Sequence, residues 1–395
     1  MCAKNILEVD TVVKGKEKSM KILIYNDLVY GGGVETLLRS FTSYFVKKGY
    51  NVTVIASPPN TDDFIKAFPT GVHCFRARIP RKNYDHFCFR YLLNQLNYKI
   101  HRVFFRLKMF LKTYDIVIAF KSIYIKEVLP FRAKRKYAWV HSDHRSIHDK
   151  SWFKKIFPNE KKELEYLNRY YRIVCVSETA KEGIVKTVGD TGNLCVLYNP
   201  IDIEKIIKLA DQESKFFKDM SKKLLVSTGR LDSDKNYMML LETCLLLNNK
   251  LSFELWIIGD GPQRKELEEY INVNKLSNVH LLGFQDNPYP IMKQADLFIS
   301  SSINETYGLA IQEAIILGVP VIAVKCSGVE EAFDTEYGVL TDNSAESLSC
   351  EIYRILNNMD LYNNFKRNIE EKYPLNQVYN ERFEKICELL EKADD

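Results

Sequence analysis

The sequence predicts an α/β fold in which two doubly wound, Rossmann-like domains face each other across a cleft. Short, continuous apolar runs recur along the chain, as expected for strands that are buried on both faces of a parallel sheet. Helical stretches separate these runs, which indicates doubly wound sheets. With 395 residues and 46% hydrophobic content, the chain can bury two cores of ordinary size, and this content argues against a disordered protein.

The predicted strands form two series. The first comprises residues 21–26, 52–56, 115–120, 137–141 and 172–177, and the second comprises 223–228, 254–258, 279–283, 296–300, 319–324 and 338–341. Between the series, residues 198–202 have the composition of a turn, so we place the domain boundary near residue 200. We therefore expect a first domain over residues 20–200 and a second over 201–375. Residues 1–19 are polar and lack periodicity, and we expect them to form a flexible extension.

Charge is divided unevenly along the chain. Residues 1–200 hold 35 Lys and Arg against 18 Asp and Glu, a balance of +17, whereas residues 201–395 hold 21 against 33, a balance of −12. Residues 76–112 contain ten Lys and Arg and a single acid, Asp85, and these basic residues alternate with Phe and Tyr. This pattern suits an interfacial helix on an anionic membrane, which we expect here. A solvated helical face and a nucleic-acid site are the alternatives, and we expect no nucleic-acid partner.

Cysteine usage and hydropathy indicate a cytoplasmic protein. The nine cysteines are scattered and form no Cys-x-x-Cys pair, which favours reduced thiols over a disulfide framework or a zinc site. The start of the chain has no apolar run suited to a signal peptide. The longest apolar run, residues 314–324, contains Gly318 and Pro320 and is too short to span a bilayer.

A glycine-rich loop follows the first predicted strand. Gly31-Gly-Gly-Val-Glu35 opens a helix, where glycine lets the backbone approach a ligand closely and the helix start favours an anion. The loop is not a Gly-x-Gly-x-x-Gly fingerprint, and no acid stands where a dinucleotide site requires one. Gly32 and Gly33 are the candidates for ligand contact, with an ordinary tight turn as the alternative.

Two cations stand on the loop after the first strand of the second domain. Arg230 and Lys235 would stabilise the charge that a diphosphate leaving group acquires, and they would do so without a metal. The same loop contains Asp232 and Asp234, which we interpret as loop or helix-capping residues. We therefore expect no metal and no other cofactor. The alternative is a solvated loop with ordinary surface charges.

Two acids in the segment 299–331 are eight positions apart. Between Glu305 and Glu313 lies Tyr307-Gly308-Leu309, where a loop is expected to turn into a helix. Free backbone N–H groups at such a helix start can hold a phosphate, and the two carboxylates can accept hydrogen bonds from sugar hydroxyls. An amphipathic helix with two surface acids is the alternative.

Polar residues also follow other predicted strands. Gly259 stands in a turn after one strand of the second domain and permits close approach of a ligand. Phe284 and Gln285 end the next strand of that domain. In the first domain, residues 141–148 contain His141, Asp143, His144 and His148, which form either a polar edge of the cleft or a metal cluster.

Together, these motifs resemble those of family 4 of the retaining, GT-B-fold glycosyltransferases, also called glycosyl transferases group 1. The resemblance runs from Met20 onward and is firmest over residues 223–331. Glu305 and Glu313 match the Glu-x7-Glu motif of this family, and Arg230 and Lys235 match its Gly-Arg-Leu-x-x-x-Lys motif.

The resemblance implies a role for each candidate residue. It implies donor binding by Gly32, Gly33, Arg230, Lys235, Gly259, Phe284, Gln285, Glu305, Tyr307, Gly308, Leu309 and Glu313. It implies catalytic roles for Glu305, Arg230, Lys235 and His141, and acceptor binding by His141, Asp143 and His144. It also implies that residues 376–395 form a helix that crosses back to the first domain.

The function implied by the resemblance is retaining transfer of a sugar from a nucleotide-sugar to a saccharide acceptor. Family frequency favours UDP-hexose or UDP-N-acetylhexosamine as donor. A lipid-linked acceptor, at the inner face of the cell membrane, would belong to the synthesis of a bacterial-type surface polysaccharide such as capsule or lipopolysaccharide. One alternative is a sugar-nucleotide epimerase on the same fold, which would leave the basic aromatic region without a role. The other is a non-catalytic adaptor for membranes or nucleic acid, against which the complete set of Arg230, Lys235, Glu305 and Glu313 argues.

Overall fold

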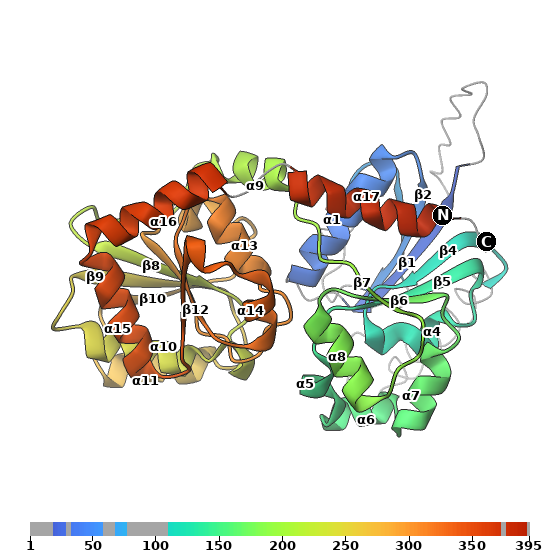
Figure 1. The fold of residues 1–395 in the computed structure, drawn as a ribbon, viewed down its shortest axis with the longest axis horizontal. Helices are drawn as coiled ribbons and strands as arrows, with labels where there is room; N and C mark the ends of the chain where they lie inside the picture. The colour runs from blue at the N-terminus through green and yellow to red at the C-terminus, as the bar shows by residue number, and fades with distance from the viewer. Residues whose placement is uncertain (1–18, 29–32, 58–67, 77–109, 373–376, 393–395) are drawn as a thin grey trace, which may run out of the picture.

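The computed structural model describes residues 19–28, 33–57, 68–76, 110–372 and 377–392. Within these ranges the chain forms two separate parallel sheets, each with helices packed on both faces (Figure 1). This architecture confirms the predicted α/β class with two doubly wound, Rossmann-like units. Most of the glycine-rich loop after the first strand and most of the basic aromatic region lie outside the described residues, as do residues 1–18.

The first sheet has the strand order β3-β2-β1-β4-β5-β6-β7 within the described residues. Its strands are β1 (Lys21–Leu28), β2 (Asn51–Ser57), β3 (Val72–Arg76), β4 (Thr113–Ala119), β5 (Arg132–Val140), β6 (Arg172–Cys175) and β7 (Leu194–Val196). The helices around it are α1 (Gly33–Lys47), η1 (Ser122–Tyr124), α4 (Ile125–Val128), α5 (His144–His148), α6 (Ser151–Ile156), α7 (Glu160–Leu167) and α8 (Glu178–Thr187). All neighbouring strands pair in parallel.

The second sheet has the order β10-β9-β8-β11-β12-β13, again within the described part of the chain. Its strands are β8 (Lys223–Thr228), β9 (Phe253–Ile258), β10 (Val279–Gly283), β11 (Leu297–Ser300), β12 (Val321–Val324) and β13 (Gly338–Thr341). The helices are α9 (Ile203–Ala210), η2 (Ser233–Lys235), α10 (Tyr237–Leu247), α11 (Arg264–Val273), α12 (Tyr289–Met292), α13 (Leu309–Ile316), α14 (Ser327–Ala332), η3 (Thr335–Tyr337), α15 (Ala345–Leu356), α16 (Met359–Lys372) and α17 (Gln377–Glu391).

Apolar strand residues supply both cores of each domain. Along β1, Leu23 packs into a cluster on one face of the sheet, whereas Ile22 and Ile24 pack into a cluster on the other face. All three are fully buried, because successive side chains of a strand point to opposite faces. This two-sided burial explains why the central strands read as continuous apolar runs.

The last helix, α17, leaves the C-terminal domain and lies against the N-terminal domain (Figure 1). Phe383 stacks on Tyr44 of α1 with ring centroids 4.3 Å apart. On the same helix, Glu384 accepts a hydrogen bond from Lys48 at 2.7 Å, and the backbone oxygen of Leu390 accepts one from Arg135. The N-terminal core thus includes residues from both ends of the chain.

Two kinds of strand differ from the prediction. β5 begins at Arg132, five residues before the predicted range. The prediction missed this start because the first half of the strand is mostly charged, has exposed or half-buried side chains and contains no apolar run. The strands β3 and β7 were not predicted, since they are short, lie at the two edges of the first sheet and contain half-buried side chains.

Candidate active site

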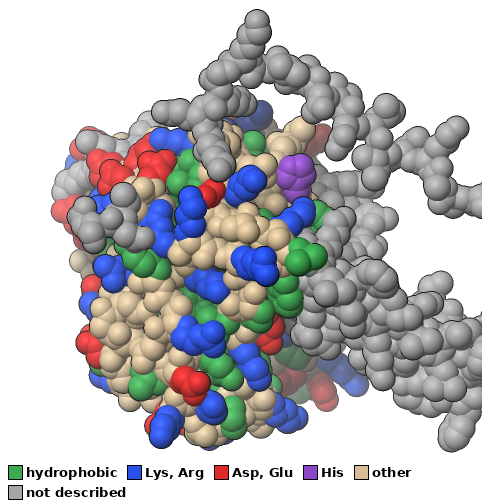
Figure 2. Space-filling view, turned by 90° about the vertical axis from the view of Figure 1, so that its right-hand side faces the viewer, with side chains coloured by type: hydrophobic (Ala, Val, Ile, Leu, Met, Phe, Trp, Pro, Cys, Tyr) green, Lys and Arg blue, Asp and Glu red, His purple; other side chains and the backbone are tan. Residues whose placement is uncertain are grey.

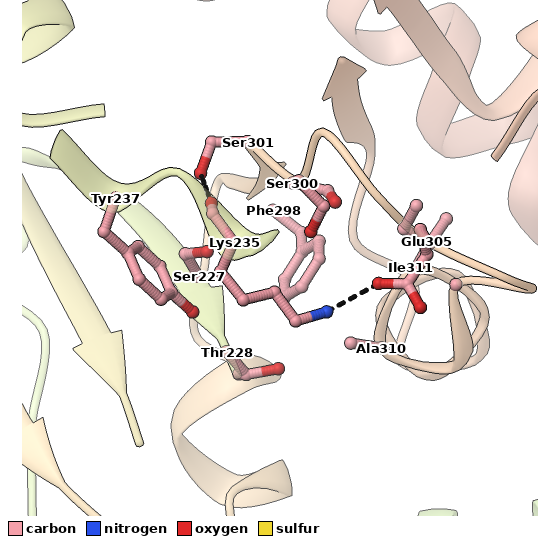
Figure 3. Close-up of a pocket in the computed structure, with 12 residues that line it drawn as sticks. Ser227, Thr228, Lys235, Tyr237, Phe298, Ser300, Ser301, Glu305, Ala310 and Ile311 are labelled. Carbon is pink, nitrogen blue, oxygen red and sulfur yellow. Dashed lines mark hydrogen bonds and ion pairs between the residues drawn. The ribbon is translucent and has the colours of Figure 1, made fainter. Parts of the chain in front are cut away.

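The predicted donor residues stand on loops that leave the carboxyl ends of strands in the second sheet. Lys235 follows β8 and Glu305 follows β11, and these strands are neighbours in the sheet. The carboxyl ends of neighbouring parallel strands meet at one edge, so two residues 70 positions apart in sequence come into contact. Lys235 Nζ lies 2.5 Å from Glu305 Oε2 (Figure 3).

The Lys235–Glu305 ion pair is held in a small polar pocket. Burial alone would lower the pKa of Lys235, but the adjacent carboxylate of Glu305 outweighs burial and raises this pKa, so the ammonium stays charged. Ser301 donates a hydrogen bond to the backbone oxygen of Lys235 at 2.7 Å. The free space in the pocket is about 10 Å³, close to the volume of one water molecule, so a sugar would have to lie outside it. Lys235 occupies Oε2 of Glu305, which leaves Oε1 to accept from a ligand.

Arg230 is the more exposed cation of this loop, with a side chain that is 68% exposed and Nε 3.7 Å from Asp232 Oδ2. The loop is shaped by Gly259, because a Cβ there would lie 1.9 Å from the backbone oxygen of Gly229. Contact of Gly259 with the donor thus stays a prediction, whereas its packing role is visible in the structure. Its bare Cα is covered by Gly229, so Gly259 acts by allowing two loops to pack closely.

Two helix starts meet where the domains touch. Gly308 caps α13 in the left-handed conformation, with φ at 66°, and Leu309 is the first residue of this helix. Across the domain junction, a Cβ built on Gly33, the first residue of α1, would lie 3.5 Å from Leu309 Cδ1. Both helix starts present free N–H groups and the positive end of a helix dipole, which suits a diphosphate. Gly32, the other predicted glycine, lies outside the described residues.

Glu313 lies on α13 and accepts a hydrogen bond from Tyr289 Oη at 3.1 Å. Burial raises the pKa of this carboxyl to about 7, although the hydrogen bond from Tyr289 opposes the shift. A carboxyl that titrates near neutrality can accept hydrogen bonds from hydroxyl groups when ionised. Its environment therefore fits the predicted contact with a ribose, provided that the pH keeps it charged.

The predicted nucleobase contacts remain accessible, whereas one predicted donor residue is not. The ring of Phe284 is 59% exposed, and Gln285 donates to the backbone oxygen of Leu282 at 2.9 Å. Tyr307, in contrast, is 4% exposed and packs against Tyr198 and Arg382, with ring and guanidinium centres 5.5 Å away. Direct donor contact by the Tyr307 side chain is thus not supported, because this side chain lies between α17 and Tyr198 of the interdomain segment 198–202, which we call the hinge.

His141 follows β5 and packs against Phe120 in a tilted arrangement, with ring centroids 4.8 Å apart. Burial, with a smaller effect from Lys121, lowers the pKa of His141 to about 3. The imidazole is therefore neutral, and proton transfer by this residue near neutral pH is not supported. Both ring nitrogens are buried and lack a well-formed hydrogen bond within the described residues, although a backbone contact with Phe120 partly offsets the lowering of the pKa of His141.

The two other residues predicted to bind the acceptor have structural roles. Asp143 caps α5 by accepting from the backbone N–H of Arg145, and it also pairs with the Arg145 guanidinium at 2.7 Å. His144 is fully buried between Glu163 at 2.8 Å and Thr187 at 2.7 Å. Both side chains are occupied within the domain, which does not favour direct acceptor contact, and their acceptor role stays a prediction.

Several residues at the domain junction were not predicted. Gly328 of α14 packs on the loop between β11 and α13, residues 301–308, which we call the donor loop; a Cβ on Gly328 would lie 2.1 Å from the backbone oxygen of Glu305. Thr306 Oγ1 accepts from the backbone N–H of Asp143 at 3.2 Å. Glu331 accepts from the N–H groups of Glu178 and Thr179, at 2.6 and 2.9 Å. The only sequence signal was the glycine just before an acidic pair, Ser327-Gly-Val-Glu-Glu331.

The described residues contain neither a candidate metal site nor a helix that could span a membrane. No group of three or more His, Cys, Asp and Glu side chains in this part of the chain could hold a metal ion. Likewise, no helix described in the structure combines the length and the hydropathy that a membrane span needs.

The fold and the site agree with known protein families. Residues 31–205 match the family model of "Glycosyltransferase Family 4", and residues 208–372 match that of "Glycosyl transferases group 1". Together the two matches cover most of the chain. The chain belongs to the GT-B glycosyltransferases of these families.

Comparisons with individual proteins are consistent with this assignment. The chain is 33% identical over 170 residues to an N-acetylgalactosaminyltransferase of Campylobacter jejuni that acts on a diphospho-undecaprenol-linked saccharide. This match covers 42% of the chain and 45% of the relative, so the chain spans less than half of that protein. Among solved structures, Anabaena HepE with UDP and glucose (TM-score 0.70, 18% identity) and TarM of S. aureus (TM-score 0.74, 16% identity) share the fold. The matches cover 95% and 94% of this chain and all of each neighbour.

Proposed function

We propose that this protein transfers a sugar from a nucleotide-sugar donor to a saccharide acceptor with retention of configuration. The observation that carries the proposal is the half-buried Lys235–Glu305 ion pair at 2.5 Å, beside a helix start that faces a second helix start across the domain junction. This arrangement combines a fixed cation, hydrogen-bond donors for phosphate and a carboxylate for hydroxyl groups. A nucleotide-sugar presents the matching groups: a diphosphate for the cation and the helix N–H groups, and sugar hydroxyls for the carboxylate.

In the proposed reaction, the diphosphate lies at the starts of α13 and α1. Arg230 and Lys235 stabilise the negative charge that develops as the glycosidic bond breaks, so no metal is required. Glu305 accepts hydrogen bonds from the donor sugar, while Glu313 accepts them from the ribose. Phe284 and Gln285 border the base.

Retention follows if the acceptor hydroxyl attacks from the face that the leaving group vacates. The departing diphosphate then takes the proton of the attacking hydroxyl, and no protein base is needed. This scheme agrees with a His141 whose lowered pKa leaves it a poor base. NMR of the product's anomeric centre tests the proposal, and an inverted product would contradict it.

We further propose a UDP-hexose or UDP-N-acetylhexosamine donor and a lipid-linked acceptor. Support for UDP comes from the structure of HepE with this nucleotide, and support for the acceptor comes from the name of the Campylobacter relative. An anionic membrane surface would be met by the basic N-terminal half. The end of the N-terminal domain that faces away from the C-terminal domain carries many Lys and Arg (Figure 2). Arg132 and Lys134, at the start of β5, are exposed.

The decisive experiment measures nucleotide release from a panel of UDP-, GDP- and ADP-sugars, with and without lipid-linked saccharide acceptors. Arg230→Ala and Lys235→Ala should each reduce transfer at least ~10²-fold, the scale expected for loss of one preorganised electrostatic partner. Lys265→Ala, which removes an exposed lysine of α11, is the matched control and should not change the rate. Full activity in both site variants would overturn the assignment of the donor site.

A further inference from the structure

The hydroxyl of Tyr237 is a buried polar group that the proposed donor site does not use. Tyr237 is the first residue of α10 and follows Lys235 by two positions. Its ring packs in a core cluster of the C-terminal domain, and the residue is 1% exposed. A phenylalanine would fill the same space, so the hydroxyl adds a polar group that needs a partner inside the protein.

The protein itself satisfies this hydroxyl poorly. Within the described residues, Tyr237 Oη lacks a well-formed hydrogen bond, although Ser227 lies close enough to influence its pKa. Burial raises the pKa of Tyr237 to about 12, while Lys235 and Ser227 oppose the shift. The phenol is therefore neutral near pH 7, and it can both donate a proton to a partner and accept one.

The hydroxyl lies beside the end of the Lys235 side chain. A Cβ built on Gly229 would lie 3.0 Å from Tyr237 Oη and 3.1 Å from Lys235 Cε, so both groups lie over the same glycine. Figure 3 shows the hydroxyl directed toward the side chains of Ser227, Thr228 and Lys235. Tyr237 is thus close to the part of Lys235 that carries the ammonium.

The small polar pocket of the donor site adjoins this hydroxyl. Its free space of about 10 Å³ has room for one water molecule. The pocket is lined by the side chains of the Lys235–Glu305 pair, by Tyr237 and by five hydroxyl residues, Ser227, Thr228, Ser300, Ser301 and Ser302. A buried water needs two to four polar partners, and this lining supplies them. The ammonium disfavours a cation here and the carboxylate disfavours an anion, so the charges also favour a neutral water.

One water in this pocket would connect the hydroxyl to the ammonium. Lys235 Nζ has three N–H donors, and one of them is directed to Glu305 Oε2 at 2.5 Å. A second can donate to the water, which Tyr237 Oη holds from its other side. The third remains available to an oxygen of the donor diphosphate. With two of its donors fixed by the protein, the ammonium is oriented before the donor binds, as electrostatic stabilisation of a leaving group requires.

We propose that Tyr237 is a positioning residue of the donor site and that its hydroxyl, through a single buried water, orients the Lys235 ammonium toward the donor diphosphate. This inference rests on the proposed glycosyltransferase function. It extends that function by a residue that acts on the diphosphate through Lys235 and does not touch the donor itself.

Tyr237→Phe removes only the hydroxyl and tests the proposal. Because the ring still fills the core, the melting temperature should stay within about 4 °C of the wild-type value. Isothermal titration with UDP, GDP and ADP identifies the nucleoside diphosphate that binds best. Its affinity should fall about tenfold in Tyr237→Phe, the scale of losing one hydrogen bond to a charged group. Wild-type affinity in this variant would overturn the proposal.

A second buried tyrosine provides the matched control. Tyr114 of β4 is 5% exposed, and its hydroxyl also lacks a hydrogen-bond partner within the part of the chain that the structure describes. It lies in the N-terminal domain, in the core on one face of the first sheet. Tyr114→Phe should therefore bind the nucleotide normally. An equal loss of affinity in both Phe variants would show that the effect is not specific to the pocket.

A double-mutant cycle with Lys235→Met shows whether the hydroxyl acts through the ammonium. Lys235→Met removes the charge but keeps an unbranched side chain, and it should weaken binding of the nucleotide. In this background Tyr237→Phe should cause no further loss, because residues that act as one unit are not additive. Equal losses in both backgrounds would contradict the proposal. Wild-type affinity in Lys235→Met, or no binding of any of the three nucleotides to the wild type, would instead refute the proposed donor site.

A crystal structure of the nucleotide-free protein gives a readout that does not depend on binding. We expect one ordered water about 2.6–3.2 Å from both Tyr237 Oη and Lys235 Nζ. In Tyr237→Phe we expect this water to be lost or the Lys235 side chain to occupy more than one conformer. A dry pocket in the wild type, or a water that contacts only the serine hydroxyls, would rule out the proposed link.

Discussion

The carboxyl of Glu313 gives the site a pH dependence that can be predicted. Its pKa is raised to about 7 by burial, and only the ionised form can accept hydrogen bonds from both ribose hydroxyls. Affinity for the nucleotide should therefore be constant above pH 7 and should fall as the pH drops below it, by up to about tenfold per pH unit. Isothermal titration of a UDP-sugar, whose diphosphate does not titrate in this range, measures this between pH 5.5 and 8.5. Glu313→Gln should bind more weakly at pH 8 and should lose the pH dependence; a pH-dependent Gln variant would contradict the assignment.

The stability of the nucleotide-free protein should show the opposite trend. A carboxyl whose pKa is higher in the folded state than in the unfolded chain contributes stability below its unfolded pKa. This contribution is lost as the pH rises through its folded pKa. For Glu313 the window runs from about 4.5 to about 7, and the change amounts to roughly 3 kcal/mol at most. The difference in unfolding free energy between wild type and Glu313→Gln, followed by urea denaturation across this window, checks the prediction. A constant difference would show that burial does not shift this carboxyl.

Among single residues, the sequence singled out Lys235 and Glu305, which the structure brings into contact at neighbouring strand ends. Arg230, Lys235, Glu305 and Glu313 could be proposed as site residues because they stand in local motifs at fixed spacing. His144 could not be judged in this way, because its burial depends on Glu163, a residue of another helix. A histidine on a ligand-facing edge and a histidine in a packed core look alike in sequence.

At the scale of elements, the strands that are buried on both faces were predicted well. β10 was predicted with its observed bounds, Val279–Gly283. The predicted strand at residues 137–141 covers only the buried end of β5, since exposed charges at its start conceal the strand pattern. Apolar periodicity therefore detects a strand only where its side chains are buried, and an exposed part of the same strand is missed.

The helix α17 connects the donor loop to the hinge. Arg382 of α17 lies between the rings of Tyr198 and Tyr307, 5.4 and 5.5 Å from their centroids, and donates to the backbone oxygen of Asn199 at 3.1 Å. Tyr307 directly precedes Gly308, the cap of α13. We infer that this contact positions the helix start that would hold the donor phosphate.

Arg382→Ala should therefore weaken binding of the donor, although Arg382 itself does not contact the proposed donor site. Loss of the guanidinium frees Tyr307, and we expect the KM for the donor to rise about tenfold, which corresponds to ~1.4 kcal/mol. Arg382→Lys should recover part of this loss, because an ammonium can still lie over the two rings. Lys385→Ala removes an exposed cation from the same helix and is the matched control. Equal KM values in Arg382→Ala and the control would show that α17 does not act on the donor loop. Steady-state kinetics at varied donor concentration provides the measurement.

At the scale of the whole molecule, contacts between the domains could not be predicted. Glu331 and Glu178 are 153 positions apart, and Asp143 and Thr306 are 163 apart, so no local pattern links either pair. Each contact joins a side chain to backbone N–H groups, which leave no mark on the identity of the partner residue. The two sheets follow from local periodicity, whereas their mutual placement depends on these non-local contacts.

Glu331 holds the two domains together in this arrangement. Its carboxylate accepts from two N–H groups at the start of α8, where the helix dipole favours a negative charge, and it also bonds to Tyr198 near the hinge. A charged acceptor bonded to backbone N–H groups is stronger than a neutral one, so Glu331→Gln should weaken this contact. We expect a larger radius of gyration by small-angle X-ray scattering and a kcat lowered by about tenfold, while the donor Kd changes less than threefold.

The neighbouring acid provides the control for this prediction. Glu330 carries the same charge on α14 but is exposed, so Glu330→Gln should leave both the scattering curve and kcat unchanged. If domain closure excludes water from the reaction, Glu331→Gln should also raise the ratio of donor hydrolysis to transfer, because an open junction admits water as a competing acceptor. A Glu331→Gln variant that matches Glu330→Gln in scattering, kcat and this ratio would show that closure does not depend on the start of α8.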